Sequence, residues 1–314
     1  MSPLAETVLF VFGLVALGYL AAAAGYLRQE AGDVLTEFAV GVALPLLLFR
    51  TMVGADFQGA APWALWATYF CAAALTWAAG HLAVTMLFGR DNQAGVVGGV
   101  SAAFSNLLLI GVPMTLGVFG PAGFEVLSLI ISIHLPIMMI ASVVLFGIFG
   151  RASEQSSAQM LRGLLVALFT NPLIVGILAG LAWRITGLPL PSLVSRLVDA
   201  LASVAAPVAL FAMGLGLRRF GISGNVWPAL VLTALKLAIM PALTLLFAWA
   251  LGLPPLAGQV AVAAAALPAG VNSYLIATRF GTGQALSSNQ MTISTALAAP
   301  TTAFWLLAAQ AALG

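Results

Sequence analysis

The sequence predicts an all-α integral membrane protein with ten transmembrane helices arranged as two inverted five-helix repeats. Three observations predict this fold: the composition is apolar, ten stretches are long enough to span a bilayer, and features of the first half recur in order in the second. Of the 314 residues, 62% are hydrophobic and 6% are charged, whereas soluble domains carry about 25% charged residues. So few charges cannot cover a water-facing surface, and lipid is therefore the expected solvent.

The apolar stretches follow one another with short connections. A membrane-spanning helix needs about 20 apolar residues, and ten stretches meet this length: 4–27, 33–53, 62–88, 93–118, 122–149, 163–184, 193–217, 225–251, 257–280 and 285–312. The first is expected to be a retained helix, because no positively charged segment precedes it. The longest polar connection falls midway. We therefore expect a first repeat at 1–150, a cytoplasmic connecting loop at 151–162 and a second repeat at 163–314.

The two halves share an order of residues. At a shift of 162 positions Gly18 corresponds to Gly180, and the segment 45–49 corresponds to 207–211. Later the shift becomes 166, where Asn106 corresponds to Asn272 and Ser128 to Ser294. Five helices is an odd number, so the second half enters the membrane with the opposite orientation, as in the inverted repeats of secondary transporters.

The orientation follows from the distribution of arginine, since cytoplasmic loops carry the excess of positive charge. With the N-terminus outside, the inner side holds seven arginines and the outer side three. Those on the inner side are Arg28, Arg90, Arg151, Arg162, Arg218, Arg219 and Arg279, and those on the outer side are Arg50, Arg184 and Arg196. Both termini are therefore expected outside the cytoplasm.

The fourth and ninth stretches carry residues that interrupt a helix. Proline removes a backbone donor and clashes with the preceding turn, and glycine and asparagine tolerate non-helical angles. The residues concerned are Ser105, Asn106, Gly111 and Pro113 in the fourth stretch, and Pro268, Gly270, Asn272 and Ser273 in the ninth. Irregular backbone at membrane depth is tolerated only where it is buried in protein or lines a cavity. Because the two interruptions occupy corresponding places, they indicate the binding site rather than ordinary kinks.

An interruption frees backbone N–H groups at the start of the next half-helix, where the helix dipole favours an anion. The amides of Asn106 and Asn272 lie beside these ends and can donate to a carboxylate. The alternative for each asparagine is a helix–helix hydrogen bond. The paired placement favours an anion site.

The sequence resembles the auxin efflux carrier family over nearly the whole chain, and four segments carry the resemblance. They are Ala103–Pro113 (AFSNLLLIGVP), Ala266–Asn272 (ALPAGVN), Asn171–Ile174 (NPLI) and Leu44–Phe49 (LPLLLF). The first two are the more specific. The chain is similar to the bacterial members, because Ser105 stands where plant members often have proline and the middle connection is short.

This resemblance implies a fold and a class of substrate. It implies ten helices, with broken helices 4 and 9 that cross, and often a homodimer. It also implies a carboxylate bound near the crossing: malonate, malate or related acids for bacterial members and auxin for plant members. The expectation is a secondary active carrier of a small mono- or dicarboxylate in the bacterial inner membrane, with H⁺ or Na⁺ as the coupling ion. A channel-like or facilitative anion uniporter and a carrier of an auxin-like aromatic acid stay open as alternatives.

Three ionisable residues in apolar stretches are candidates for handling charge. Lys236 lies near the middle of the eighth stretch and His134 inside the fifth, and such residues are functional candidates by default. Lys236 either couples charge to transport or caps freed carbonyls of a broken helix. Arg50 either acts on the anion or extends its side chain to the outer interface. Asp199, three residues after Arg196, is expected to pair with it.

Other classes of function lack their motifs. The sequence contains no HExxH, no phosphate loop and no metal-ligand cluster, so an enzyme, a metal site and a cofactor are not expected. A basic tract of the kind that binds nucleic acid is absent as well. The single cysteine, Cys71, excludes an intrachain disulfide.

Overall fold

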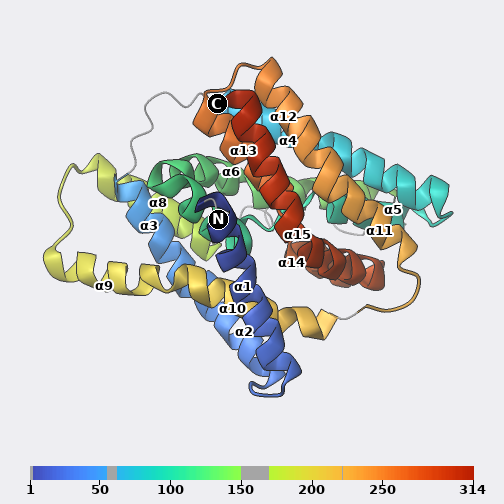
Figure 1. Ribbon diagram of the computed structural model, residues 1–314, viewed down its shortest axis with the longest axis horizontal. Helices are drawn as coiled ribbons and strands as arrows, with labels where there is room; N and C mark the ends of the chain where they lie inside the picture. The colour runs from blue at the N-terminus through green and yellow to red at the C-terminus, as the bar shows by residue number, and fades with distance from the viewer. Residues whose placement is uncertain (1–2, 55–61, 150–169, 221) are drawn as a thin grey trace. The chain divides into compact units, whose positions relative to one another are not determined.

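The computed structural model describes residues 3–54, 62–149, 170–220 and 222–314, and these residues are helical almost throughout (Figure 1). Within the described residues no strand forms, and the only extended pairing is a bridge between two single residues. The elements of the first half are α1 (Pro3–Ala23), α2 (Gln29–Phe38), η1 (Ala39–Ala43), α3 (Leu44–Gly54), α4 (Pro62–Leu82), η2 (Ala83–Leu87), α5 (Asn92–Ala103), η3 (Leu107–Gly111) and α6 (Val112–Phe149). Those of the second half are α8 (Pro172–Ile185), α9 (Ser192–Ser203), α10 (Ala205–Phe220), α11 (Trp227–Ala234), η4 (Leu235–Ile239), α12 (Met240–Ala250), α13 (Pro255–Ala266), α14 (Val271–Arg279) and α15 (Gln284–Leu313).

Seven helices of the described residues are long and apolar enough to cross a membrane, which confirms an all-helical membrane protein. They are Leu4–Ala23, Glu30–Gly54, Pro62–Leu87, Leu107–Phe149, Ser192–Arg218, Trp227–Ala250 and Gln284–Leu313. Two shorter apolar helices are Pro172–Ile185 and Pro255–Ala266. They overlap two further predicted stretches, 163–184 and 257–280. The inverted repeat of ten spans stays a prediction, and the expected loop at 151–162 lies outside the described residues.

One glycine separates two predicted stretches inside a long helix. The residues of α6 run from Val112 to Phe149, but Gly120 has φ 65° and ψ −162°, which is not helical. Glycine adopts such angles without steric cost because it has no Cβ. The chain therefore turns at Gly120, between the predicted stretches 93–118 and 122–149.

The chain forms two compact units that do not coincide with its sequence halves. Unit 1 comprises residues 1–59, 108–132 and 155–219, and unit 2 comprises 60–107, 133–154 and 220–314. Each half of the sequence contributes to both units. Unit 2 therefore contains the part of α6 that begins at Ile133, together with α4, α5 and the helices from α11 to α15.

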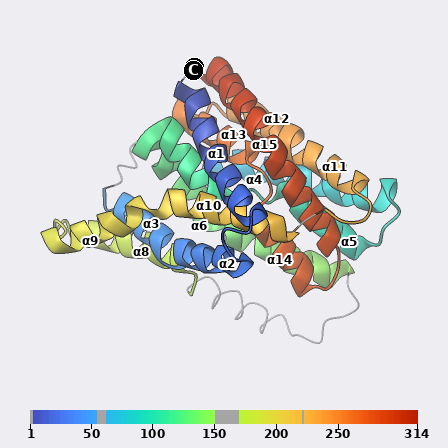
Figure 2. The same cartoon turned by 60° about the horizontal axis from the view of Figure 1, so that its bottom comes forward.

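In unit 1, two helix crossings depend on glycine. A Cβ on Gly18 of α1 would collide with the carbonyl of Phe211 in α10, and a Cβ on Gly180 of α8 would lie 2.6 Å from the carbonyl of Phe49 in α3. At the shift of 162 positions Gly18 corresponds to Gly180, and Phe49 corresponds to Phe211. The same pair of residues therefore makes the same close approach twice. Figures 1 and 2 both show α8 and α9 beside α3, against which they pack.

In unit 2, small residues bring helices close to α4. All the residues from Ala94 to Ala103 of α5 are buried, and a Cβ on Gly98 or Gly99 would collide with Val84 or Trp77. Close approach through small residues is a common way for membrane helices to associate. Helix α4 also packs against α12 and α13, and α13 packs against α15. This packing surrounds the ends of α5 and α13, where the site lies.

Candidate functional site

Two interrupted segments of unit 2 lie side by side as a short antiparallel pair. Helix α5 ends at Ala103, and Phe104 is extended with φ −81° and ψ 102°. Helix α13 ends at Ala266, followed by an extended Leu267. Ser105 and Ala269 form a bridge. The Asn106 N–H donates to the Pro268 carbonyl and the Gly270 N–H to the Phe104 carbonyl, both at 2.9 Å. We call residues 104–106 and 267–270 the crossover.

The residue types at the crossover suit this geometry. Pro268 has no N–H, so it can take part in the pair only through its carbonyl, which accepts from Asn106. A Cβ on Gly270 would lie 3.2 Å from the Phe104 ring and 3.5 Å from the Asn106 Cα. Asn106, which is buried, therefore lies directly beside the residue that precedes α14.

The second segment of the crossover is held by three side chains, one from η4 and two from α15. The Lys236 ammonium donates to the Ala265 carbonyl at 2.6 Å, and the Thr302 hydroxyl donates to the Ala266 carbonyl at 3.2 Å. The Ala269 N–H donates to the Ser294 hydroxyl at 3.2 Å. Two carbonyls at the end of α13 and one N–H of the crossover thus have partners, as buried backbone groups require.

The start of α14 offers unpaired donors. In the described part of the chain no partner is recorded for the N–H groups of Val271 and Asn272 or for the half-buried Asn272 side chain. The Ser273 hydroxyl instead donates to the Gly270 carbonyl at 2.8 Å. Free N–H groups at a helix start, together with the helix dipole, attract negative charge.

A polar face of α15 borders the crossover, and most of its residues are not among those predicted from the sequence. Ser287 donates to Ser273 at 3.0 Å, Ser294 accepts from Ala269, and Gln290 lies between them on the same helix face. The Gln290 side chain is fully buried, and neither of its amide atoms has a hydrogen-bond partner among the described residues. The sequence does carry a signal that could have revealed this face, because four consecutive polar residues, Ser287 to Gln290, lie inside an apolar stretch.

Lys236 lies on the π-helical turn η4 and is completely buried. Pro241, five residues later, cannot donate to the Leu237 carbonyl, which instead accepts from the Trp305 indole at 2.7 Å. Besides Ala265, the Lys236 ammonium contacts the Met240 sulfur at 3.3 Å. This contact is the capping of a freed carbonyl that was predicted as the alternative to charge coupling.

His134 lies inside an aromatic cluster of unit 2. Its ring centre is 4.6 Å from that of Phe104, 5.6 Å from that of Tyr69 and 6.2 Å from that of Phe70. The imidazole is buried, and neither nitrogen has a hydrogen-bond partner in the described residues. The ring lies beside the crossover, because Phe104 is one of the crossover residues.

The remaining predicted residues belong to unit 1. Gly111 and Pro113 are buried there. Arg50 of α3 pairs with Asp199 of α9 at 3.3 Å, so the predicted pair of Asp199 with Arg196 is wrong. The exposed fractions of the Arg50 and Asp199 side chains are 40% and 52%. Packing of α3 against α9 brings together two residues that are far apart in sequence, a contact that helical spacing cannot reveal.

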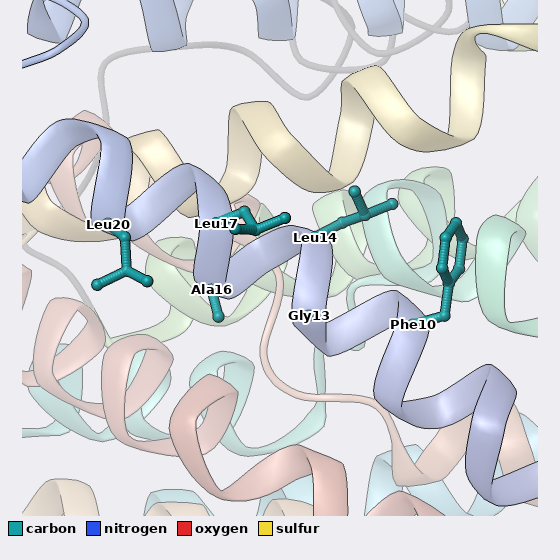
Figure 3. A pocket seen from close by; sticks show the side chains of 6 residues that line it. All are labelled: Phe10, Gly13, Leu14, Ala16, Leu17 and Leu20. Atoms are coloured by element: carbon teal, nitrogen blue, oxygen red, sulfur yellow. The ribbon is translucent and has the colours of Figure 1, made fainter.

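A surface pocket in unit 1 does not have the character of an anion site. It measures about 380 Å³ and is lined by one face of α1: Phe10, Gly13, Leu14, Ala16, Leu17 and Leu20 (Figure 3). Ligand sites combine apolar walls with a few polar groups that fix the ligand's orientation, and this lining offers no polar side chain. No group of three metal-ligating side chains comes together in the described residues either.

Comparison with known proteins identifies the family. The family described as "Membrane transport protein" matches residues 3–306. The chain is 30% identical to a Rhizobium meliloti protein named "Putative malonate transporter", with 96% of this chain and 94% of the relative covered. It is 27% identical to an "Uncharacterized transporter" of Methanothermobacter thermautotrophicus, with 96% of each chain covered. The resemblance seen in the sequence is thus confirmed: the chain is a multi-pass membrane protein of the membrane transport protein family, the auxin efflux carriers.

Proposed function

We propose that the protein is a secondary active transporter that moves a small organic anion across the cytoplasmic membrane by alternating access. The observation that carries this proposal is the crossover of unit 2, where two interrupted backbone segments pair and leave the N-terminus of α14 with unpaired donors. Interrupted helices near the middle of a bilayer are a common construction for substrate sites in secondary transporters. The proposed role of the crossover is to bind the carboxylate of the substrate.

Electrostatics in unit 2 favours an anion. The N-terminus of α14 contributes partial positive charge, and the amino group of Lys236, when protonated, adds positive charge one residue from the end of α13. Among the described residues of unit 2 the only acidic side chain is Asp91. Asp91 caps the opposite end of α5 by accepting from the Ala94 N–H, about 18 Å from the crossover at 1.5 Å per residue. A carboxylate at the crossover therefore meets donors and positive charge.

Four polar side chains are proposed to contact the substrate. Asn106 and Asn272 flank Gly270, and their amides can donate to it. Ser105 and Ser273 add hydroxyl groups, and Pro268 and Gly270 shape the backbone around them. The relative named as a malonate transporter supports a small carboxylate over an auxin-like aromatic acid. The proposed orientation keeps both termini outside the cytoplasm.

Uptake into proteoliposomes tests this proposal. Reconstituted protein should take up labelled malonate with saturation, and unlabelled malonate inside should accelerate uptake, because a carrier exchanges substrate whereas a channel does not. An imposed pH or Na⁺ gradient in the same vesicles identifies the coupling ion. Absence of saturation and of exchange would favour the facilitative, channel-like alternative.

Asparagine variants locate the site. Asn106→Ala and Asn272→Ala should each weaken malonate binding by about 1–3 kcal/mol, the usual loss for a hydrogen bond to a charged group. Asn92→Ala is a matched control, since Asn92 is exposed at the start of α5, and it should bind like the parent. If both crossover variants bind and transport normally at equal expression, the carboxylate does not bind there.

A further inference from the structure

A second group of polar atoms in unit 2 has no partners. The hydroxyls of Tyr69 and Ser105 and both ring nitrogens of His134 are buried without a hydrogen bond within the described residues. Tyr69 is 0%, Ser105 1% and His134 4% exposed. Buried polar groups are nearly always satisfied, and each unsatisfied one costs roughly 1–3 kcal/mol. Four such atoms in one place indicate that a ligand supplies the missing partners.

These atoms come from three different elements that meet at the crossover. Tyr69 lies on α4, Ser105 in the crossover and His134 on α6. The Tyr69 and His134 rings are 5.6 Å apart between centres in an edge-on arrangement. Ser105 is the close polar neighbour of both: its side chain lies near the Tyr69 hydroxyl and its backbone near the imidazole, in neither case with hydrogen-bond geometry.

The chemistry of this cluster selects an acceptor with negative charge. Two hydroxyls and a neutral imidazole offer three N–H or O–H donors. Lys236 lies close enough to His134 to act on it electrostatically, which disfavours a cation. Phe70 and Phe104 form apolar walls around the ring. A carboxylate can accept several hydrogen bonds at once, so it matches this set of donors.

We propose that Tyr69, Ser105 and His134 form a second subsite that binds the second carboxylate of a short dicarboxylate. This inference rests on the proposed function, in which the first carboxylate binds at Asn106, Asn272 and the start of α14. Ser105 belongs to the crossover itself, so the two subsites adjoin and a short carbon chain can link them. In this proposal the cluster makes the protein bind dicarboxylates more tightly than monocarboxylates.

The test compares malonate, a three-carbon dicarboxylate, with propionate, its three-carbon monocarboxylate counterpart. Dissociation constants are measured on purified protein, for propionate by competition at high concentration. Tyr69→Phe, which removes only the hydroxyl, should weaken malonate binding about 10-fold, as expected for a lost bond to a charged group. Propionate binding should change less than about 2-fold, because propionate does not use this subsite. Ser105→Ala should act in the same direction if Tyr69→Phe does not fold.

Three further variants make the result specific. Tyr26→Phe removes a hydroxyl from a tyrosine that is 85% exposed in unit 1, and it should leave both constants unchanged. Asn272→Ala should weaken malonate and propionate alike, because it contacts the carboxylate that they share. His134→Phe should reproduce the selective loss of malonate affinity.

Each other outcome overturns a defined part of the proposal. Unchanged malonate affinity in both Tyr69→Phe and His134→Phe, or an equal loss for both probes, would overturn the second subsite and leave the proposed function intact. Parent protein that binds propionate as tightly as malonate would do the same. Parent protein that binds neither probe would overturn the proposed substrate class and this inference with it.

Discussion

The two segments of the crossover differ in how their polar groups are satisfied. Around 267–270, Lys236, Thr302 and Ser294 supply partners for two carbonyls and one N–H. Around 104–106, the Ser105 hydroxyl and its neighbours Tyr69 and His134 have no partners among the described residues. The protein thus completes one segment by itself and leaves the other incomplete. We infer that residues 104–106 meet the second carboxylate of the ligand, whereas residues 267–270 hold the crossover together and position the donors at the start of α14.

The largest effect on stability is expected from Lys236→Met. Methionine has a similar length but cannot donate, so the buried Ala265 carbonyl loses its partner at a cost of about 1–3 kcal/mol. Thermal unfolding in detergent should show the loss, and gradient-driven malonate accumulation in proteoliposomes should fall. Unchanged stability together with abolished accumulation would assign Lys236 to charge coupling rather than to the support of α13. Unchanged stability and unchanged transport would remove both roles.

A smaller loss is expected from Ser294→Ala. This variant leaves the buried Ala269 N–H without an acceptor, which costs about 1–2 kcal/mol in the free energy of unfolding. Ser142→Ala is the matched control, because its buried hydroxyl donates to the Met138 carbonyl of its own helix. If the two variants unfold at the same temperature, the Ala269–Ser294 bond does not support the crossover.

The smallest effect on stability is expected from Ser105→Ala. Its hydroxyl has no partner in the described residues, so its removal should change the free energy of unfolding by less than about 0.5 kcal/mol, or stabilise the protein slightly, since an unsatisfied buried group is lost. Malonate binding should nevertheless weaken. A loss of stability as large as that of Lys236→Met would show that both segments are satisfied by the protein, and the contrast between them would disappear.

Arg50 and Asp199 show where spacing along the chain gives the wrong partner. Arg196 is three residues from Asp199 and is its nearest basic residue in the sequence, but Arg50 pairs with Asp199 from another helix. Both partners are well exposed, and such pairs contribute about 0–1 kcal/mol. Arg50 therefore has a structural partner in unit 1, and a role for it in handling the anion stays a prediction.

The sequence by itself determined the class of solvent, most of the helical stretches and the two places where the backbone is irregular. These features are local: they depend on runs of apolar residues and on proline, glycine and asparagine, whose backbone preferences act within a few residues. It also identified Lys236, His134 and the two asparagines as candidates, because a polar side chain in an apolar stretch is visible in the sequence.

Only the tertiary structure decided which groups meet. The pairing of Ser105 with Ala269, the bond from Lys236 to Ala265 and the cluster of Tyr69 with His134 join residues 29 to 164 positions apart. Such contacts depend on how helices pack, and a single sequence carries no spacing rule for them. In the sequence nothing distinguishes Tyr69 from the other aromatic residues of the apolar stretches, or Gln290 from the polar residues next to it. Their burial without partners beside the crossover became visible only when α4, α6 and α15 were placed around it, because satisfaction of a polar group is a property of its surroundings and not of its sequence position.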